Sequence, residues 1–114
     1  MSARTPRPRR ASRKLAPVFA ALGDETRLAL VTRLCAGSPL SIAELTQGGA
    51  VTRQAITKHL RVLQGAGLVR GVKQGRESLF ELEPQRLDEA RQALERISQQ
   101  WDLALGRLKA FVEK

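Results

Sequence analysis

The chain has 114 residues, one cysteine, one histidine and a formal net charge of +9. This length allows one domain with a modest core, and no segment is long and apolar enough to cross a membrane. The N-terminus lacks the apolar segment of a secretory signal, and one cysteine permits no internal disulfide, so we expect a cytoplasmic protein. The basic excess lies in residues 1–14 and 41–80, which predicts a polyanion partner, most often nucleic acid.

The first 14 residues contain two prolines and five arginines. They offer too little apolar surface to become ordered, so we predict a disordered basic arm over residues 1–14. Arginine side chains of such an arm can follow a DNA backbone or a minor groove. They can equally keep the chain soluble, and the sequence favours neither role for Arg7, Arg9, Arg10 and Arg13.

Two helices are predicted next, after an apolar stretch, LAPVFAAL, that begins at Leu15. The first opens at Asp24, a typical N-cap, and closes before Gly37. Cys35 shares a stripe with Leu28 and Val31 in this helix, so we expect it to be a small core residue, with a thiol switch as the alternative. The motif Ser41-x-x-Glu44 is a capping box and predicts a short helix over residues 42–47.

A further helix is predicted after the turn that contains Gly48 and Gly49, with Thr52 as its N-cap. Ile56, Leu60 and Leu63 recur at helical spacing and are expected to face the core. Two short helices joined by a tight turn are typical of a helix-turn-helix. Its second helix would expose the polar side chains of Arg53, Gln54, Thr57, Lys58 and Arg61.

These polar side chains match the chemistry of base and phosphate recognition. Arginine can bind guanine through two hydrogen bonds, glutamine can bind adenine, and threonine can contact a base or a phosphate. We predict that Arg53, Gln54 and Thr57 read bases and that Thr52, Lys58 and Arg61 hold phosphates. The alternative is a solvated helix surface without a ligand.

After Gly67 the pattern changes from helix to strand. The runs LVRGV and SLFEL flank KQGR, which predicts a hairpin whose basic tip carries Lys73, Gln74 and Arg76. The predicted fold is mostly α with a small β-hairpin, a winged helix-turn-helix over residues 15–83 that continues into a long C-terminal helix over residues 84–114.

The last helix carries a heptad pattern of apolar residues, with Trp101 near its middle. A seam of this length needs a partner surface, so we predict a homodimer. The seam consists of Leu87, Ala90, Leu94, Ile97, Trp101, Ala104, Leu108 and Phe111.

Metal binding and catalysis are not predicted. His59 is the only histidine and Cys35 the only cysteine, so one chain cannot supply a usual zinc ligand set. The two residues lie on different predicted helices, which leaves no nucleophile paired with a base. We expect His59 to be a packed, hydrogen-bonded residue at the edge of its helix, with a phosphate contact as the alternative. We expect neither a cofactor nor an enzyme.

The segments LGDETRLALVTRL, SIAELTQGGAVTRQAITKHLRVLQGAGLV and GRESLFEL resemble the ArsR family of bacterial winged-helix repressors. The resemblance covers residues 15 to about 84, and the last helix with its tryptophan is similar to that of a metal-independent branch. It implies a homodimer that binds an inverted-repeat operator and commonly represses its own operon. Metal-sensing members carry a cysteine pair before the recognition helix, or histidines and carboxylates on the last helix. Here residues 42–47 hold no cysteine and the last helix holds no histidine.

The sequence therefore predicts a dimeric, sequence-specific transcriptional regulator, with an architectural DNA- or RNA-binding protein as the alternative. The two classes differ in the ratio of specific to non-specific affinity, which for a specific regulator is at least about a thousandfold. The operator, the regulated genes and the inducer do not follow from the sequence.

Overall fold

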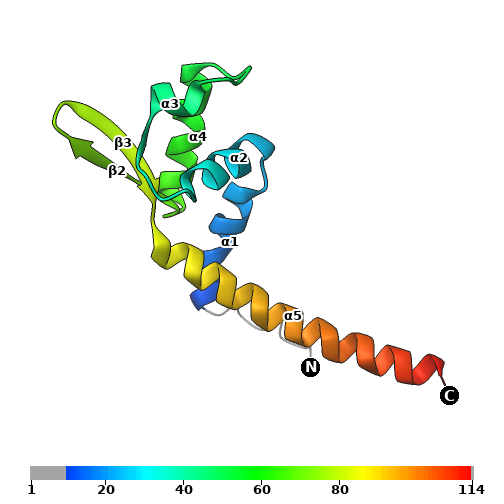
Figure 1. The fold of residues 1–114 in the computed structure, drawn as a ribbon. Helices are drawn as coiled ribbons and strands as arrows, with labels where there is room; N and C mark the ends of the chain where they lie inside the picture. Colours follow the sequence, from blue (N-terminus) through cyan, green and yellow to red (C-terminus); the bar gives the residue numbers. More distant parts are fainter. Residues whose placement is uncertain (1–9, 114) are drawn as a thin grey trace, which may run out of the picture.

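The computed structural model describes residues 10–113, and the side chains from residue 15 onward. Five helices and three strands follow one another along the chain (Figure 1). In chain order they are α1 (Arg10–Leu22), α2 (Glu25–Leu34), β1 (Leu40–Ser41), α3 (Ile42–Thr46), α4 (Arg53–Gly65), β2 (Val69–Gln74), β3 (Glu77–Leu82) and α5 (Pro84–Val112). This arrangement confirms the predicted winged helix-turn-helix fold with a long C-terminal helix.

Helix α1 begins earlier than the sequence indicated. The predicted disordered arm ran to residue 14, whereas the backbone is helical from Arg10 onward. Leu15, Val18 and Ala21 are buried on one side of this helix. Once these residues fix a helical segment, extending it by a few residues costs little, because only the first turn is expensive to form. Residues 1–9 of the predicted arm lie outside the described residues.

The helix-turn-helix consists of α3, the turn after it, and α4. The Ser41 side chain accepts from the backbone N–H of Glu44, whose carboxylate in turn accepts from the Ser41 N–H, so the predicted capping box is present. Thr52 caps α4 by accepting from the backbone N–H of Ala55 at 3.2 Å. The turn between the helices contains Gly48 at φ +75°, a conformation that favours glycine.

The wing is a three-stranded antiparallel sheet in the order β1-β3-β2. The β2–β3 hairpin was predicted, and Gly75 at φ +62° occupies the first position of its two-residue turn, where type II′ turns need glycine. Strand β1 was not predicted. It has only two residues, with Leu40 opposite Phe80, and two residues are too few to show an alternating pattern.

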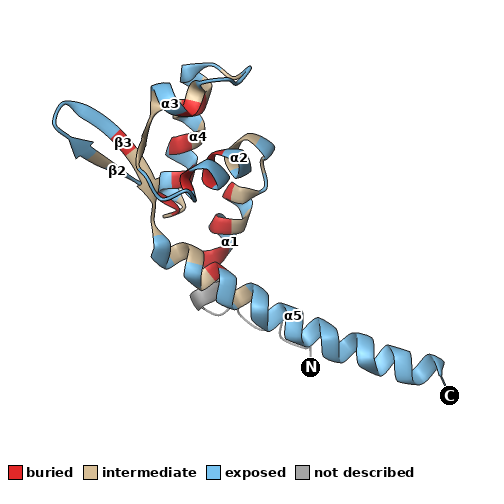
Figure 2. Ribbon diagram, in the orientation of Figure 1, coloured by how far each residue is buried: buried red, intermediate tan, exposed pale blue. Residues whose placement is uncertain are grey.

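The core lies where α1, α2, α4 and the base of the wing meet (Figure 2). Ile56, Leu60 and Leu63 of α4 are buried, as predicted. The prediction for α2 was partly wrong, because Cys35 is exposed and Leu28 is 51% exposed. The buried side chains of α2 are Leu30, Val31 and Leu34, so the helix turns a narrower face to the core than its composition indicated.

Helix α5 contacts the domain only at its beginning. Ala90 is buried and belongs to the core cluster, whereas every side chain from Leu94 to Glu113 is exposed. The second half of α5 consequently projects away from the domain (Figure 1). Within the described residues, none of the helices combines the length and apolar character that a membrane-spanning helix needs.

Candidate nucleic-acid interface

The polar face of α4 is exposed opposite its core face. Thr52, Arg53, Gln54, Lys58 and Arg61 are all exposed, whereas Thr57 is partly covered. Arg53 and Gln54 occupy the first two helical positions, directly after the Thr52 cap. The six predicted residues therefore lie on the solvent-facing side of α4, from its N-cap at Thr52 to Arg61 in its second half.

Two threonine hydroxyls on this surface are already engaged within the helix. Thr52 Oγ1 accepts the cap hydrogen bond, which leaves its own proton free to donate. Thr57 Oγ1 donates to the carbonyl oxygen of Arg53 at 2.8 Å. The Thr57 hydroxyl can therefore offer a ligand only its acceptor lone pairs, beside the methyl group.

The predicted wing residues lie at or near the end of the hairpin. Arg76 is in the turn, Gln74 pairs with Glu77 at the last position of the sheet, and Lys73 pairs with Ser78 one step further back. All three predicted side chains are exposed. Lys73 is thus a strand residue rather than a member of the turn itself.

The cations of α4 and the wing tip lack the partners that most other described cations have, although Arg96 and Arg107 on α5 are unpaired as well. Among the described residues, Arg53, Lys58, Arg61, Lys73 and Arg76 form no ion pair and no side-chain hydrogen bond. Such side chains keep their full capacity to bind an anion.

Arg70, at the base of the wing, is neutralised by two carboxylates. Its Nε lies 2.7 Å from Glu81 Oε1, and its Nη1 lies 3.3 Å from Glu83 Oε2. The hydrogen bond to Glu81 and the charge of Glu83 raise the pKa of Arg70 above its ordinary value. Arg70 counted toward the basic excess in the sequence, but strand register places the two carboxylates beside it.

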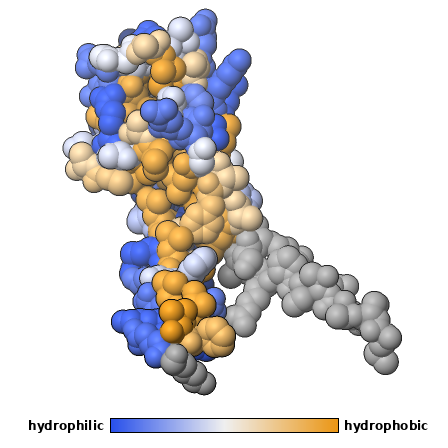
Figure 3. Space-filling model, turned by 90° about the vertical axis from the view of Figure 1, so that its right-hand side faces the viewer, coloured by the Kyte–Doolittle hydropathy of each residue, from blue (hydrophilic) through white to orange (hydrophobic). Residues whose placement is uncertain are grey.

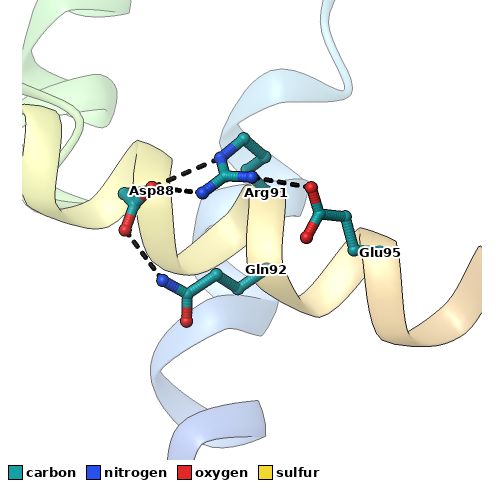
Figure 4. A network of polar contacts seen from close by, with 4 residues as sticks. All are labelled: Asp88, Arg91, Gln92 and Glu95. Atoms are coloured by element: carbon teal, nitrogen blue, oxygen red, sulfur yellow. Dashed lines mark hydrogen bonds and ion pairs between the residues drawn. The ribbon is translucent and has the colours of Figure 1, made fainter.

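Arg91 on α5 is neutralised in a similar way, within a single helix. It donates to Asp88 at 2.9 Å and to Glu95 at 2.6 Å, and Gln92 also donates to Asp88 (Figure 4). The hydrogen bond to Asp88 is the main reason that the pKa of Arg91 is raised. Among the described residues, five unpaired cations therefore lie on α4 and the wing tip and two, Arg96 and Arg107, lie further along α5, whereas those of the strand base and of early α5 are paired.

His59 lies on the side of α4 away from this polar face, where α1, α2 and α4 meet. Its Nδ1 is 3.4 Å from Arg27 Nη1 and 3.8 Å from Asp24 Oδ2. The backbone N–H of Arg27 donates to Asp24 and is the main cause of the lowered pKa of that carboxyl group, to which the charge of Arg27 also contributes. The prediction of a packed, hydrogen-bonded histidine agrees with this position.

The described residues contain no group of three or more His, Cys, Asp or Glu side chains that could hold a metal ion. Cys35 is exposed just after the end of α2, and the nearest basic group to His59 is a guanidinium, which repels a cation. Arg7 and Arg9 lie outside the described residues. Arg10 and Arg13 lie in α1, where the structure describes their backbone but not their side chains.

The predicted dimer seam is almost entirely exposed in the single chain. Ala90 is buried and Leu87 partly buried beside Phe19 and Leu22 of α1, with which they line a shallow apolar groove. Apolar surface continues from the domain toward the free end of α5 (Figure 3). Its exposed seam residues are Leu94, Ile97, Trp101, Leu108 and Phe111. Sequence reasoning missed the α1 residues of the groove, because they lie about 70 positions from their α5 neighbours.

Comparisons with known proteins agree with this architecture. Residues 22–72 match the family described as a helix-turn-helix domain. The chain is 40% identical over 85 residues to the HTH-type transcriptional regulator Rv2034 of Mycobacterium tuberculosis (strain ATCC 25618 / H37Rv), covering 75% of this chain and 76% of that protein. The structure of an ArsR-like transcriptional regulator from Rhodococcus sp. RHA1 is similar at a TM-score of 0.73 and 42% identity, covering 87% of this chain and 92% of that one.

A more distant structure shares the fold. It is the homodimeric winged helix-turn-helix DNA-binding domain Mb0332 of Mycobacterium bovis, described as a possible ArsR-family regulator. The TM-score is 0.64 at 21% identity, and the alignment covers 88% of this chain and 91% of that one. The likeness therefore extends well beyond the helix-turn-helix segment.

Proposed function

Because the chain belongs to the ArsR family of DNA-binding helix-turn-helix transcriptional regulators, and not to a class of enzymes, we propose that it is a homodimeric repressor of an inverted-repeat operator. The observation that carries this proposal is that five of the cations without a partner among the described residues lie on the exposed side of α4 and at the wing tip. A DNA duplex presents a major groove for a helix and flanking phosphates for a wing, and α4 and the hairpin supply these two elements.

The side chains divide into two roles by position and by free hydrogen-bonding capacity. Arg53 and Gln54 stand at the start of α4, which is the part of a recognition helix that contacts base edges. Thr57 joins them as an acceptor or through its methyl group, for example against a thymine methyl. Thr52, with its free proton, holds a phosphate. Lys58, Arg61, Lys73, Gln74 and Arg76 also contact the backbone of the DNA.

Dimerisation follows from the exposed side of α5. Most of the stability of a helix in a protein comes from packing of its apolar face, and burying one large apolar side chain contributes about 1.5–3 kcal/mol. Leu94, Ile97, Trp101, Leu108 and Phe111 supply five such side chains in each chain. A second copy would cover them by two-fold symmetry, and a two-fold dimer in turn requires a two-fold operator.

We propose repression rather than activation because a dimer bound across a promoter blocks access to it without needing any further contact. As a regulator of chromosomal genes, the protein would act in the cytoplasm, on the nucleoid. We also propose that it responds to no metal through its described side chains, since neither Cys35 nor His59 belongs to a group of three or more possible ligands there. Stoichiometric zinc retained after purification, together with operator release when zinc is removed, would contradict this part of the proposal.

A selection from a random-sequence DNA library tests the main proposal. We expect the purified protein to enrich one inverted repeat and to bind it at least about a thousandfold more tightly than scrambled DNA. Placed over a promoter, the repeat should reduce transcription when the protein is added. An unenriched library, or equal affinity for all sequences, would instead support the architectural DNA- or RNA-binding alternative.

A further inference from the structure

Arg27, in the first turn of α2, contacts three parts of the fold at once. Its Nε donates to the carbonyl oxygen of Ala21 at 2.6 Å, in the last turn of α1. Its Nη1 lies 3.4 Å from His59 Nδ1 on α4. Its backbone N–H donates to Asp24, the N-cap of α2, at 3.0 Å. One side chain therefore bridges α1 and α4.

The hydrogen bond between Arg27 and His59 can have only one direction. A guanidinium only donates, so His59 Nδ1 is the acceptor, and the neutral ring carries its proton on Nε2. His59 lies about half a turn of the helix away from Gln54 and Arg61, on the core side of α4. The side chain thus faces the body of the domain, and a change in its contact acts on the orientation of the whole helix.

The α1 end of the bridge leads to the dimerisation helix. Phe19 and Leu22 of α1 line the same apolar groove as Leu87 and Ala90 of α5, so the two helices pack against each other. The α1–Arg27–α4 bridge therefore connects the helix that would read DNA with the pair of helices that would form the dimer. The apolar contacts around it are non-directional, whereas hydrogen bonds define an angle.

We propose that Arg27 is a positioning residue, which orients α4 relative to α1 and α5 and so determines the half-site spacing that the dimer accepts. This inference rests on the proposed function, because it requires a dimer that reads an inverted repeat. Inserting one base pair between half-sites moves one of them by roughly 3.4 Å and turns it by roughly 35°. A rigidly oriented α4 penalises such a change, and a loosely held α4 tolerates it.

The test uses the selected operator and versions of it with one base pair removed, or with one or two inserted, between the half-sites. Arg27→Gln should weaken binding at the selected spacing and reduce the preference for that spacing by roughly five- to tenfold. Arg27→Lys should behave alike, because lysine is a compact point donor and lacks the separate Nε and Nη1 donors that reach Ala21 and His59. Equal weakening at every spacing would overturn the inference and leave Arg27 with a purely stabilising role.

Substitutions at the other end of the bridge separate positioning from stability. His59→Gln keeps an acceptor for Arg27 and should retain the spacing preference, whereas His59→Leu should lose it.

Arg33→Gln is the matched control. Arg33 also lies on α2 and donates to two carbonyl oxygens, those of Leu45 and Glu44 at 2.9 Å, but it joins α2 to α3. We expect the Arg33→Gln variant to show the same preference for half-site spacing as the wild type.

A measurement without DNA tests the contact itself. Because the chain has one histidine, the ring nitrogens of His59 give a single set of NMR resonances. When the ring is neutral, these resonances should show the proton on Nε2 in the wild type. A proton on Nδ1 would overturn the inference. Failure of the proposed function appears differently, as a library without an enriched sequence, whereas failure of this inference leaves an operator whose spacing preference does not depend on Arg27.

Discussion

The guanidinium of Arg70 lies 2.7 Å from the carboxylate of Glu81 across the β2–β3 pair. Six residues along the hairpin, Arg76 has no such partner among the residues that the structure describes. The charge of Arg70 is therefore compensated by a carboxylate, whereas the charge of Arg76 on the same wing is not. The difference provides a matched pair for testing phosphate binding.

Arg76→Ala should weaken binding to the operator and to scrambled DNA about equally. Each phosphate contact contributes about 0.9 to the slope of log affinity against log salt, so the slope should fall by about 1.8 in the dimer. Titrations at several salt concentrations measure it. Arg70→Ala is the control and should change the slope little, because its charge is already compensated. A similar slope change for both variants would contradict the assignment.

Arg53→Ala should alter sequence preference instead. A bidentate arginine–guanine contact contributes about 1–3 kcal/mol of discrimination, so one base pair in each half-site should lose its preference. The measurement compares affinities for the operator, for its single-base variants and for scrambled DNA. If the operator-to-scrambled ratio is unchanged in Arg53→Ala, and also after substitution of Gln54 and Thr57, α4 is not a reading helix.

The double variant Leu94→Glu, Trp101→Glu should be monomeric at micromolar concentration, because both changes place charge in the apolar seam. Analytical ultracentrifugation measures the association state. Leu103→Glu is the control. Leu103 is as exposed as Trp101, at 66% against 62%, but it lies roughly 200° around the helix from it. A double variant that stays dimeric would show that another surface forms the dimer.

Neighbouring residues at the end of α2 should differ strongly in their effect on stability. Leu34 is fully buried, so Leu34→Ala should lower the free energy of unfolding by about 2–5 kcal/mol. Cys35 is exposed, and Cys35→Ser should change it by less than about 0.5 kcal/mol. Urea unfolding of the two variants provides the comparison. A large loss of unfolding free energy in Cys35→Ser would show that Cys35 packs in the core, as the sequence suggested.

Acid should remove a stabilising contribution from Asp24. The backbone N–H of Arg27 lowers the pKa of this carboxyl in the folded chain, so its contribution is complete above the ordinary carboxyl range. It is lost as the pH falls through the lowered pKa. Asp24→Asn should flatten the acid side of a plot of urea midpoint against pH. Asp102→Asn, at an exposed carboxylate of α5, should leave the plot unchanged.

The caps and the periodic faces could be predicted from the sequence because their interactions span only a few residues. Ser41 with Glu44, Thr52 with Ala55, and the buried side of α4 all follow from i to i+3 and i+4 spacing. The hairpin followed from two apolar runs around a glycine-containing turn. Nothing in these patterns requires knowledge of a distant segment.

The sequence by itself thus determined the helices from Asp24 onward, the hairpin and the buried face of α4, but not which residues of α2 are buried. Tertiary structure decided which charges remain available. Arg70 is neutralised because strand register places Glu81 and Glu83 beside it, and β1 forms only because β3 is present to pair with it. The bridge from Ala21 through Arg27 to His59 spans 38 positions of sequence. Chain packing creates such contacts, because their directional hydrogen bonds need donors and acceptors that meet only after the helices have docked.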